Sequence, residues 1–198
     1  MEAPADRPDA APKSADADIG ALVIAARGGC PDAVDRLLAW AEAPLYRFAR
    51  QLCGDVQTAL DVVQETLIEL LRQLPSLRRP ASVKHWLFRV AARKVERRRD
   101  RRRREVPLAV ADWFETQDTP ALRGMLEAER AERVRNAVRL LPPPMRAALV
   151  LTVVEGFSVA EAARICHTRA GTIKSRLFHA RRLLRKWLAD YGPKDSST

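Results

Sequence analysis

Long hydrophobic runs, cysteine motifs and a secretory signal are all missing from this 198-residue sequence. No apolar run approaches the roughly 18 residues that a membrane span needs, and residues 1–19 lack the apolar core of a signal peptide. The three cysteines, Cys30, Cys53 and Cys166, have neither CxxC nor Cys/His ligand spacing, which argues against a disulfide framework or a zinc site. The sequence therefore predicts a protein of the reducing cytoplasm, without membrane insertion, metal or cofactor.

Motifs of enzyme chemistry are missing as well. The sequence contains no GxSxG motif and no phosphate-binding P-loop. Its three histidines, His85, His167 and His179, have no cysteine or carboxylate at ligand spacing. We therefore expect no catalytic residues, and we do not expect an enzyme.

Glycine is scarce, with eight residues, and β-branched residues do not cluster, which argues against an all-β fold. Apolar residues recur instead at i, i+3, i+4 and i+7, the spacing of a helix with one buried face. Proline and glycine mark where several helices end. The predicted fold class is all-α, with two small helical domains and helices over residues 19–27, 32–52, 60–74, 83–95 or beyond, 126–141, 145–155, a short segment after 158, and 169–190.

Two of these helices have predicted buried faces. The face of the first consists of Leu60, Val63, Leu67, Leu70, Leu71 and Leu74. Ser82 is expected to cap the second, whose buried stripe is Val83, Trp86, Leu87, Val90, Ala91 and Val95.

Charge divides the chain into segments. With 35 basic against 25 acidic residues, the net charge is +10, which indicates a polyanionic partner. Residues 72–104 hold fourteen bases and two acids, residues 164–187 hold eight bases and no acid, and the stretch between the two blocks is acidic and contains proline. We therefore predict a disordered tail over 1–18, a domain over 19–104, a flexible linker over 105–124, a domain over 125–191 and a tail over 192–198.

The second basic block follows a helix-turn-helix pattern. Ser158 and Glu161 have the S-x-x-E spacing of a capping box, and three residues, 166–168, separate the short helix they begin from a long basic one. The polar face of the long helix offers donors to base edges and phosphates. We predict DNA contact there over the alternative, a basic face that is merely solvated.

The arginine-rich segment 97–104 contains seven arginines and no apolar residue. It either continues the preceding helix or frays into a solvated end. In both cases it attracts phosphate by counterion release without recognising sequence. For Trp86 the alternatives are stacking on an unpaired base and packing in the core, and its place on the apolar stripe favours the core.

Four segments resemble bacterial sigma factors, in the family's order. Residues 59–67 (ALDVVQETL) and 85–91 (HWLFRVA) are similar to region 2 of these proteins. Residues 141–146 (LPPPMR) with 155–163 (EGFSVAEAA) resemble the start of region 4, and 171–177 (GTIKSRL) resembles its recognition helix. With only a short linker between the two regions, the layout is similar to that of extracytoplasmic-function sigma factors.

The resemblance implies a function and its residues. Members of this family direct core RNA polymerase to promoters: region 2 docks on the β′ clamp and captures the melted −10 element, and region 4 recognises the −35 duplex. Core-binding residues would be Asp61, Gln64 and Glu65. The −10 contacts would be Arg78, Arg79, Lys84, Trp86, Arg89, Arg93, Lys94 and Arg97. The −35 contacts would be Thr168, Arg169, Gly171, Thr172, Lys174, Ser175, Arg176, His179 and Arg182.

The implied partners are core RNA polymerase, through its β′ clamp and β flap, promoter DNA, and an anti-sigma factor, with the holoenzyme at the bacterial nucleoid. Three positions depart from the family pattern. His167 replaces a turn glycine, Leu60 replaces an acid, and Arg169 replaces a capping serine, which leaves Thr168 as the expected cap. The alternatives are a sigma-like mimic without initiation activity and a nonspecific nucleic-acid binder.

Overall fold

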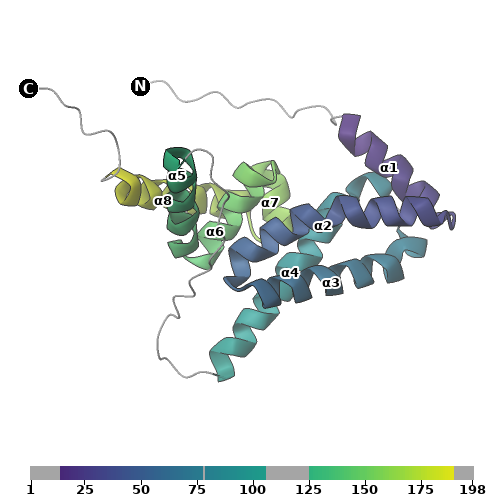
Figure 1. Ribbon diagram of the computed structural model, residues 1–198, viewed down its shortest axis with the longest axis horizontal. Helices are drawn as coiled ribbons and strands as arrows, with labels where there is room; N and C mark the ends of the chain where they lie inside the picture. The colour runs from purple at the N-terminus through teal and green to yellow at the C-terminus, as the bar shows by residue number, and fades with distance from the viewer. Residues whose placement is uncertain (1–13, 78, 106–124, 190–198) are drawn as a thin grey trace, which may run out of the picture.

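The computed structural model describes residues 14–77, 79–105 and 125–189. Within these ranges the regular structure is helical, without a strand, which confirms the all-α prediction. The N-terminal half contains α1 (Ser14–Arg27), α2 (Pro31–Cys53), α3 (Val56–Gln73) and α4 (Val83–Glu105) (Figure 1). The C-terminal half contains α5 (Met125–Leu140), α6 (Pro143–Leu149), α7 (Val159–Ile165) and α8 (Ala170–Ala189). Two 3-10 turns, Leu74–Ser76 and Pro80–Ser82, join α3 to α4, and a π-helical turn, Val150–Val154, follows α6.

Short polar motifs set several helix ends. The Asp55 carboxylate accepts a hydrogen bond from the Thr58 amide at 2.7 Å and so caps α3. The predicted capping box of α7 is present: the Glu161 side chain accepts from the Ser158 amide at 2.7 Å, and the Glu161 amide donates to the Ser158 hydroxyl at 3.3 Å. Gly156, with φ 73°, follows the π-helical turn in the left-handed conformation that glycine adopts without strain.

Other boundaries differ from the predictions. Helix α1 begins at Ser14, so residues 14–18, which we assigned to the tail, are helical. The Ser82 hydroxyl donates to the Arg79 carbonyl at 2.8 Å within a 3-10 turn, in place of the predicted cap of α4. Helix α4 continues to Glu105, which settles the alternative between a helix and a frayed end for the arginine-rich segment. The remainder of the predicted N-terminal tail, the linker from 106 and the C-terminal tail lie outside the described residues.

The predicted buried face of α3 is wrong at two positions. Leu60 and Leu71 are 45% and 42% exposed, whereas Ala59 and Val62 are fully buried. The buried face is therefore rotated toward smaller side chains. Thr66 is also buried there, because its hydroxyl donates to the Val62 carbonyl at 2.6 Å and needs no other partner. An apolar stripe on α3 consequently faces outward.

The predicted stripe of α4 is buried except at Trp86, which is half-buried. Phe88, which lies off that stripe, is buried too, at 2% exposure. The reason is that α4 contacts the rest of the N-terminal half on one side and α7 on the other. A helix enclosed on two sides buries more than the single face that periodicity indicates.

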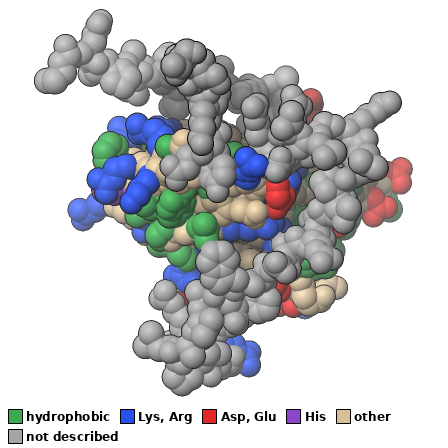
Figure 2. Space-filling view, turned by 60° about the vertical axis from the view of Figure 1, so that its left-hand side comes forward, with side chains coloured by type: hydrophobic (Ala, Val, Ile, Leu, Met, Phe, Trp, Pro, Cys, Tyr) green, Lys and Arg blue, Asp and Glu red, His purple; other side chains and the backbone are tan. Residues whose placement is uncertain are grey.

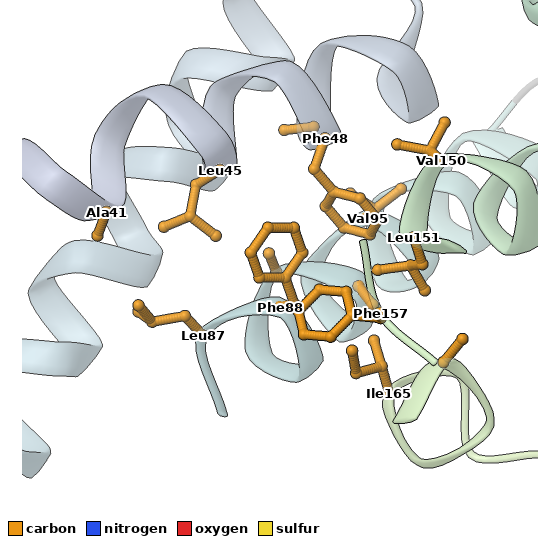
Figure 3. Close-up of a cluster of buried hydrophobic side chains, with 14 of the residues drawn as sticks. Ala41, Leu45, Phe48, Leu87, Phe88, Val95, Val150, Leu151, Phe157 and Ile165 are labelled. Carbon is orange, nitrogen blue, oxygen red and sulfur yellow. The ribbon is translucent and has the colours of Figure 1, made fainter. Parts of the chain in front are cut away.

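The two halves pack against each other around aromatic side chains. Phe48 of α2, Phe88 of α4 and Phe157, which precedes α7, meet edge to face, with ring centroids 5.2 and 4.9 Å apart (Figure 3). Buried residues of both halves belong to one continuous apolar cluster. The sequence predicts two modules, and the structure adds a contact between them.

Candidate nucleic-acid and protein interfaces

The turn before α8 holds the two helices of the helix-turn-helix in place. The Thr168 amide donates to the Ala163 carbonyl at 2.9 Å. His167 has φ 49°, the left-handed conformation for which the related pattern uses glycine. The Arg169 carbonyl accepts from the amides of Thr172 and Ile173. Arg169 thus occupies the cap position, and the structure shows no capping hydrogen bond from the Thr168 side chain that we expected to take this role.

Helix α8 has one buried face and one basic face. Ile173, Leu177 and Ala180 are buried in the C-terminal half. The residues that we predicted to contact the −35 element all lie on the rest of α8 or just before it. Exposed among them are Arg169, Gly171, Lys174, Ser175 and Arg182, and half-buried are Thr168, Thr172, Arg176 and His179.

The cations of α8 are available to a ligand. In the described part of the chain, no acidic side chain forms an ion pair with a lysine or arginine of this helix. Figure 2, in which the left-hand side of Figure 1 is turned forward, shows Lys and Arg side chains gathered on one side with few acids among them. A face with this charge and these donors can bind phosphates and base edges.

Helix α3 presents a mixed apolar and acidic surface. Asp61 is half-buried and accepts from Gln57 Nε2 at 3.3 Å, and Gln64 is exposed. Beside them on the outward face are four apolar side chains that are each at least 40% exposed: Val56, Leu60, Ile68 and Leu71. We call this set, with Asp61 and Gln64, the α3 surface. Its apolar part was missed because helical spacing alone assigned Leu60 and Leu71 to the core.

Glu65 differs from Asp61 and Gln64 because basic side chains of α4 form ion pairs with its carboxylate. Its carboxylate pairs with Arg98 at 2.6 Å and with Lys94 at 3.5 Å. Partial burial opposes the change, but the hydrogen bond and charge of Arg98, assisted by Lys94, hold the pKa of Glu65 below its ordinary value. Of the three residues that we predicted to bind core polymerase, Glu65 therefore already forms ion pairs within the protein.

The predicted −10 residues do not form one free surface. Arg79, Arg89 and Arg97 are exposed. Arg93 pairs with Glu69 at 3.2 Å, and Lys94 pairs with Glu69 at 3.1 Å as well as with Glu65. Arg78 lies outside the described residues, and Trp86 packs against the apolar cluster. Two of the five cationic α4 residues that we predicted to contact the −10 element, Arg93 and Lys94, thus have acidic partners on α3.

The side chain of Lys84 contacts the C-terminal half. Its ammonium lies 4.9 Å from the centroid of the Phe157 ring and donates to the Glu155 carbonyl at 3.3 Å. In this arrangement of the chain, Lys84, which we predicted to contact the −10 element, is therefore engaged within the protein. Sequence gave no signal for it, because the two residues it contacts are more than 70 positions away.

Two family models match this chain: "Sigma-70 region 2" over residues 41–105 and "Sigma-70, region 4" over residues 131–184. The ECF RNA polymerase sigma factor EcfG of Rhodopseudomonas palustris is 36% identical over 158 residues, covering 77% of this chain and 86% of the relative. This chain belongs to the ECF sigma factors. It is therefore a transcription initiation factor and not an enzyme.

Other relatives agree. ECF sigma factor SigM of Mycobacterium tuberculosis is 30% identical, with 84% of this chain and 83% of the relative covered. The sigma factor RpoE of Bartonella quintana, solved in complex with the anti-sigma factor NepR, matches with a TM-score of 0.67 and 30% identity, covering 78% of this chain and 96% of that one. CnrH, solved with the cytosolic domain of CnrY, matches with a TM-score of 0.61 and 25% identity, covering 88% and 98% of the two chains.

The sigma factor shows no metal centre in its described residues, where no group of three or more potential ligand side chains comes together. Among the same residues, no helix is both long and apolar enough to span a membrane. The three cysteines form no disulfide with one another, and burial raises the pKa of Cys166 to about 11, so its thiol stays protonated at neutral pH.

Proposed function

We propose that this sigma factor binds core RNA polymerase through the α3 surface and recognises promoters with its two basic helices. Helix α8 recognises the −35 duplex, and the exposed arginines around α4 hold the melted −10 element. The observation that carries the proposal is the basic face of α8, which has no acidic partner among the described residues and belongs to a helix-turn-helix whose first helix begins with a capping box.

The α3 surface has the composition of a protein-binding site. Exposed apolar side chains that lie together on one helix face mark sites of protein association, and here Leu60 and Ile68 flank the polar groups of Asp61 and Gln64. We propose that the polymerase β′ clamp covers this surface, with the β flap on the C-terminal half. Glu65 contributes indirectly, because its pairs with α4 hold α3 and α4 together.

On DNA, the residues of α8 have different tasks. Lys174 is exposed near the start of the helix and reaches phosphate as a point charge. Arg176 is half-buried and can donate two parallel hydrogen bonds, to a phosphate or to a guanine. On the −10 side, Arg79, Arg89 and Arg97 supply positive charge for unpaired strands.

An anti-sigma factor completes the set of proposed partners. The sigma factor RpoE, which is similar to this chain, was solved in complex with the anti-sigma factor NepR, and CnrH, also similar, was solved in complex with the cytosolic domain of CnrY. We propose that this chain is held inactive by a partner of the same kind and acts at the nucleoid once it is released into holoenzyme.

A titration of fluorescent full-length chain with core polymerase tests the proposal. Asp61→Ala combined with Gln64→Ala, and separately Leu60→Ala combined with Ile68→Ala, should each weaken binding at least about tenfold, which corresponds to about 1.4 kcal/mol. Asp35→Ala, which removes an exposed acid from α2, is the control and should bind like wild type. Wild-type affinity in both double variants would remove the α3 surface from the polymerase interface.

A further inference from the structure

The segment Glu155–Ser158, which we call the 155–158 loop, lies between the two halves just before the helix-turn-helix. Phe157 is 5% exposed and packs edge to face on Phe88 (Figure 3). The centroid of its ring also lies 5.2 Å from that of the His85 ring. The loop therefore inserts an aromatic side chain from the C-terminal half into the N-terminal half, where it becomes part of the shared apolar cluster.

Polar contacts surround this aromatic insertion. The Glu155 carboxylate, on a residue 7% exposed, faces Arg47 of α2 at 3.5 Å, and the Glu155 carbonyl accepts from Lys84 of α4. On α7, Glu161 pairs with His85 at 2.8 Å. Through Glu155 the loop therefore contacts two helices of the N-terminal half, α2 and α4, and Glu161 adds a contact from α7 to α4.

A second contact lies at the other end of the same interface. The guanidinium of Arg146, on α6, donates to the Gln51 carbonyl near the end of α2 at 2.9 Å. It also donates to the Leu141 carbonyl within its own half at 3.1 Å. A cation near the carboxyl end of a helix is stabilised by the partial negative charge there. The interface thus has two anchoring points rather than one.

This closed arrangement conflicts with simultaneous recognition of two promoter elements. The −10 and −35 elements are named for positions about 25 base pairs apart, or roughly 80 Å of duplex at 34–36 Å per turn. Between Phe157, which touches Lys84, and the start of α8 lie only a seven-residue helix, about 10 Å long, and a short turn. The proposed −10 and −35 surfaces must separate before both can be occupied.

We propose that the 155–158 loop is an internal inhibitor that holds this sigma factor closed and occupies Lys84 until polymerase separates the halves. The inference rests on the proposed function, because closure matters only if both halves must bind DNA. The apparent affinity for promoter DNA falls in proportion to the fraction of closed molecules. Weakening the loop contacts should therefore open the chain without any partner.

Single-molecule energy transfer on the full chain measures this directly. Dyes are attached at Glu42→Cys on α2 and Ala160→Cys on α7, both exposed positions, with the three native cysteines replaced by alanine. Wild type should show a high-transfer, closed population. Phe157→Ala should raise the ratio of open to closed molecules at least about tenfold, because it removes the buried ring that joins the halves.

A charge reversal tests the same contact without making a cavity. Arg47→Glu places a carboxylate against Glu155 on a side chain that is itself 55% exposed, so it should open the chain, and adding Glu155→Gln should close it again. The matched control is Arg36→Glu, an exposed position on the same face of α2 three turns away, which should stay closed.

The outcomes separate the two claims. A wild-type chain that is already open, or an Arg47→Glu variant that behaves like Arg36→Glu, would overturn the inhibitor. Circular dichroism of Phe157→Ala checks that the variant keeps its helices. If it does not, Arg47→Glu with and without Glu155→Gln tests whether the loop holds the chain closed. Adding core polymerase should shift wild type to the open population; if core leaves it closed while Arg47→Glu opens it, the proposed function fails and the closed contact stands.

Discussion

Helices α4 and α8 are both rich in basic residues, but they differ in how many of these residues form ion pairs in the structure. Both have an apolar face and a run of lysines and arginines. Glu65 and Glu69 of α3 neutralise Arg93, Lys94 and Arg98 on α4, whereas the described residues place no acid against the cations of α8. The number of basic residues in a segment therefore overstates what that segment can offer to DNA.

The difference follows from what each helix packs against. Helix α4 lies beside α3, whose glutamates at positions 65 and 69 are one turn apart and so point to the same side. Helix α8 packs on α6 and α7, which present mainly apolar side chains to it. In α4 part of the charge stabilises the fold, and in α8 the charge is left for a partner.

The largest expected effect is the loss of charge from α8. Lys174→Gln, Arg176→Gln and Arg182→Gln together should lower the affinity for mixed-sequence duplex DNA on the order of a hundredfold, because each cation releases counterions on contact with phosphate. The slope of log K against log salt should fall by up to about 2.7, at about 0.9 per contact. Fluorescence anisotropy at four salt concentrations measures both quantities. An unchanged slope would mean that these three cations of α8 do not contact DNA phosphates.

The matched triple substitution in α4 should have a smaller effect. Arg93→Gln, Lys94→Gln and Arg98→Gln remove the same numbers of lysine and arginine, but these cations already have partners. We expect less than half of the slope change seen for α8, with a loss in the free energy of unfolding of about 1 kcal/mol, since exposed pairs contribute about 0.2–1 kcal/mol each. Equal slope changes in the two triples would show that ion pairing does not reduce the available charge.

Removing the acids of α3 tests the converse. Glu65→Gln with Glu69→Gln frees the cations of α4, so nonspecific DNA affinity should rise a few-fold and its salt dependence should steepen. Asp32→Asn with Asp35→Asn, at exposed positions of α2, is a control for the change in net charge. If the control raises affinity as much as the α3 variant, the effect comes from net charge and the pairs have no special part in it.

The smallest expected effect is a pH-dependent change in stability at Glu155, which contacts the first turn of α4 through Lys84. Burial raises the pKa of Glu155, although Arg47 and Lys84 act against the shift. A carboxyl whose folded pKa is raised destabilises the fold when ionised, so this penalty is present at neutral pH and disappears as pH falls through the raised pKa. Glu155→Gln should therefore be more stable than wild type at pH 7, with the difference shrinking toward pH 4.

Urea unfolding of both proteins at pH 4, 5, 6 and 7 measures that difference. Glu65 and Glu161 have lowered pKa values and lose their stabilising contributions as pH falls. They do so in wild type and variant alike, so their effect cancels in the comparison. A variant that is less stable than wild type at pH 7 would mean instead that the Glu155 carboxylate is stabilised by its neighbours.

Local signals in the sequence predicted local structure well. The capping box at Ser158, the end of a helix near residue 155 and most of the buried stripe of α4 are found in the structure, because each depends on residues within one or two turns. We assigned Leu60 and Leu71 to the core because leucines at helical spacing define two overlapping faces of α3. No local signal showed that the buried face is the one that includes Ala59 and Val62.

The candidate sites were predicted in part for the same reason. The exposed residues of α8 follow from one helix whose buried face is evident. The pairing of Glu65 with Arg98 joins residues 33 positions apart, and Lys84 meets Glu155 across 71. Such contacts depend on how helices pack, and a resemblance to the family names the residues without showing which of them are already engaged.

Transcription by core polymerase from a library of promoters, randomised in the −35 and −10 elements, tests the central claim most directly. With wild-type chain, the account predicts transcripts from a distinct subset of sequences. The α8 triple should lose the −35 preference, and the α4 triple should keep it. A wild-type chain that binds core yet gives no promoter-dependent transcripts above core alone would contradict the account and indicate a sigma-like mimic.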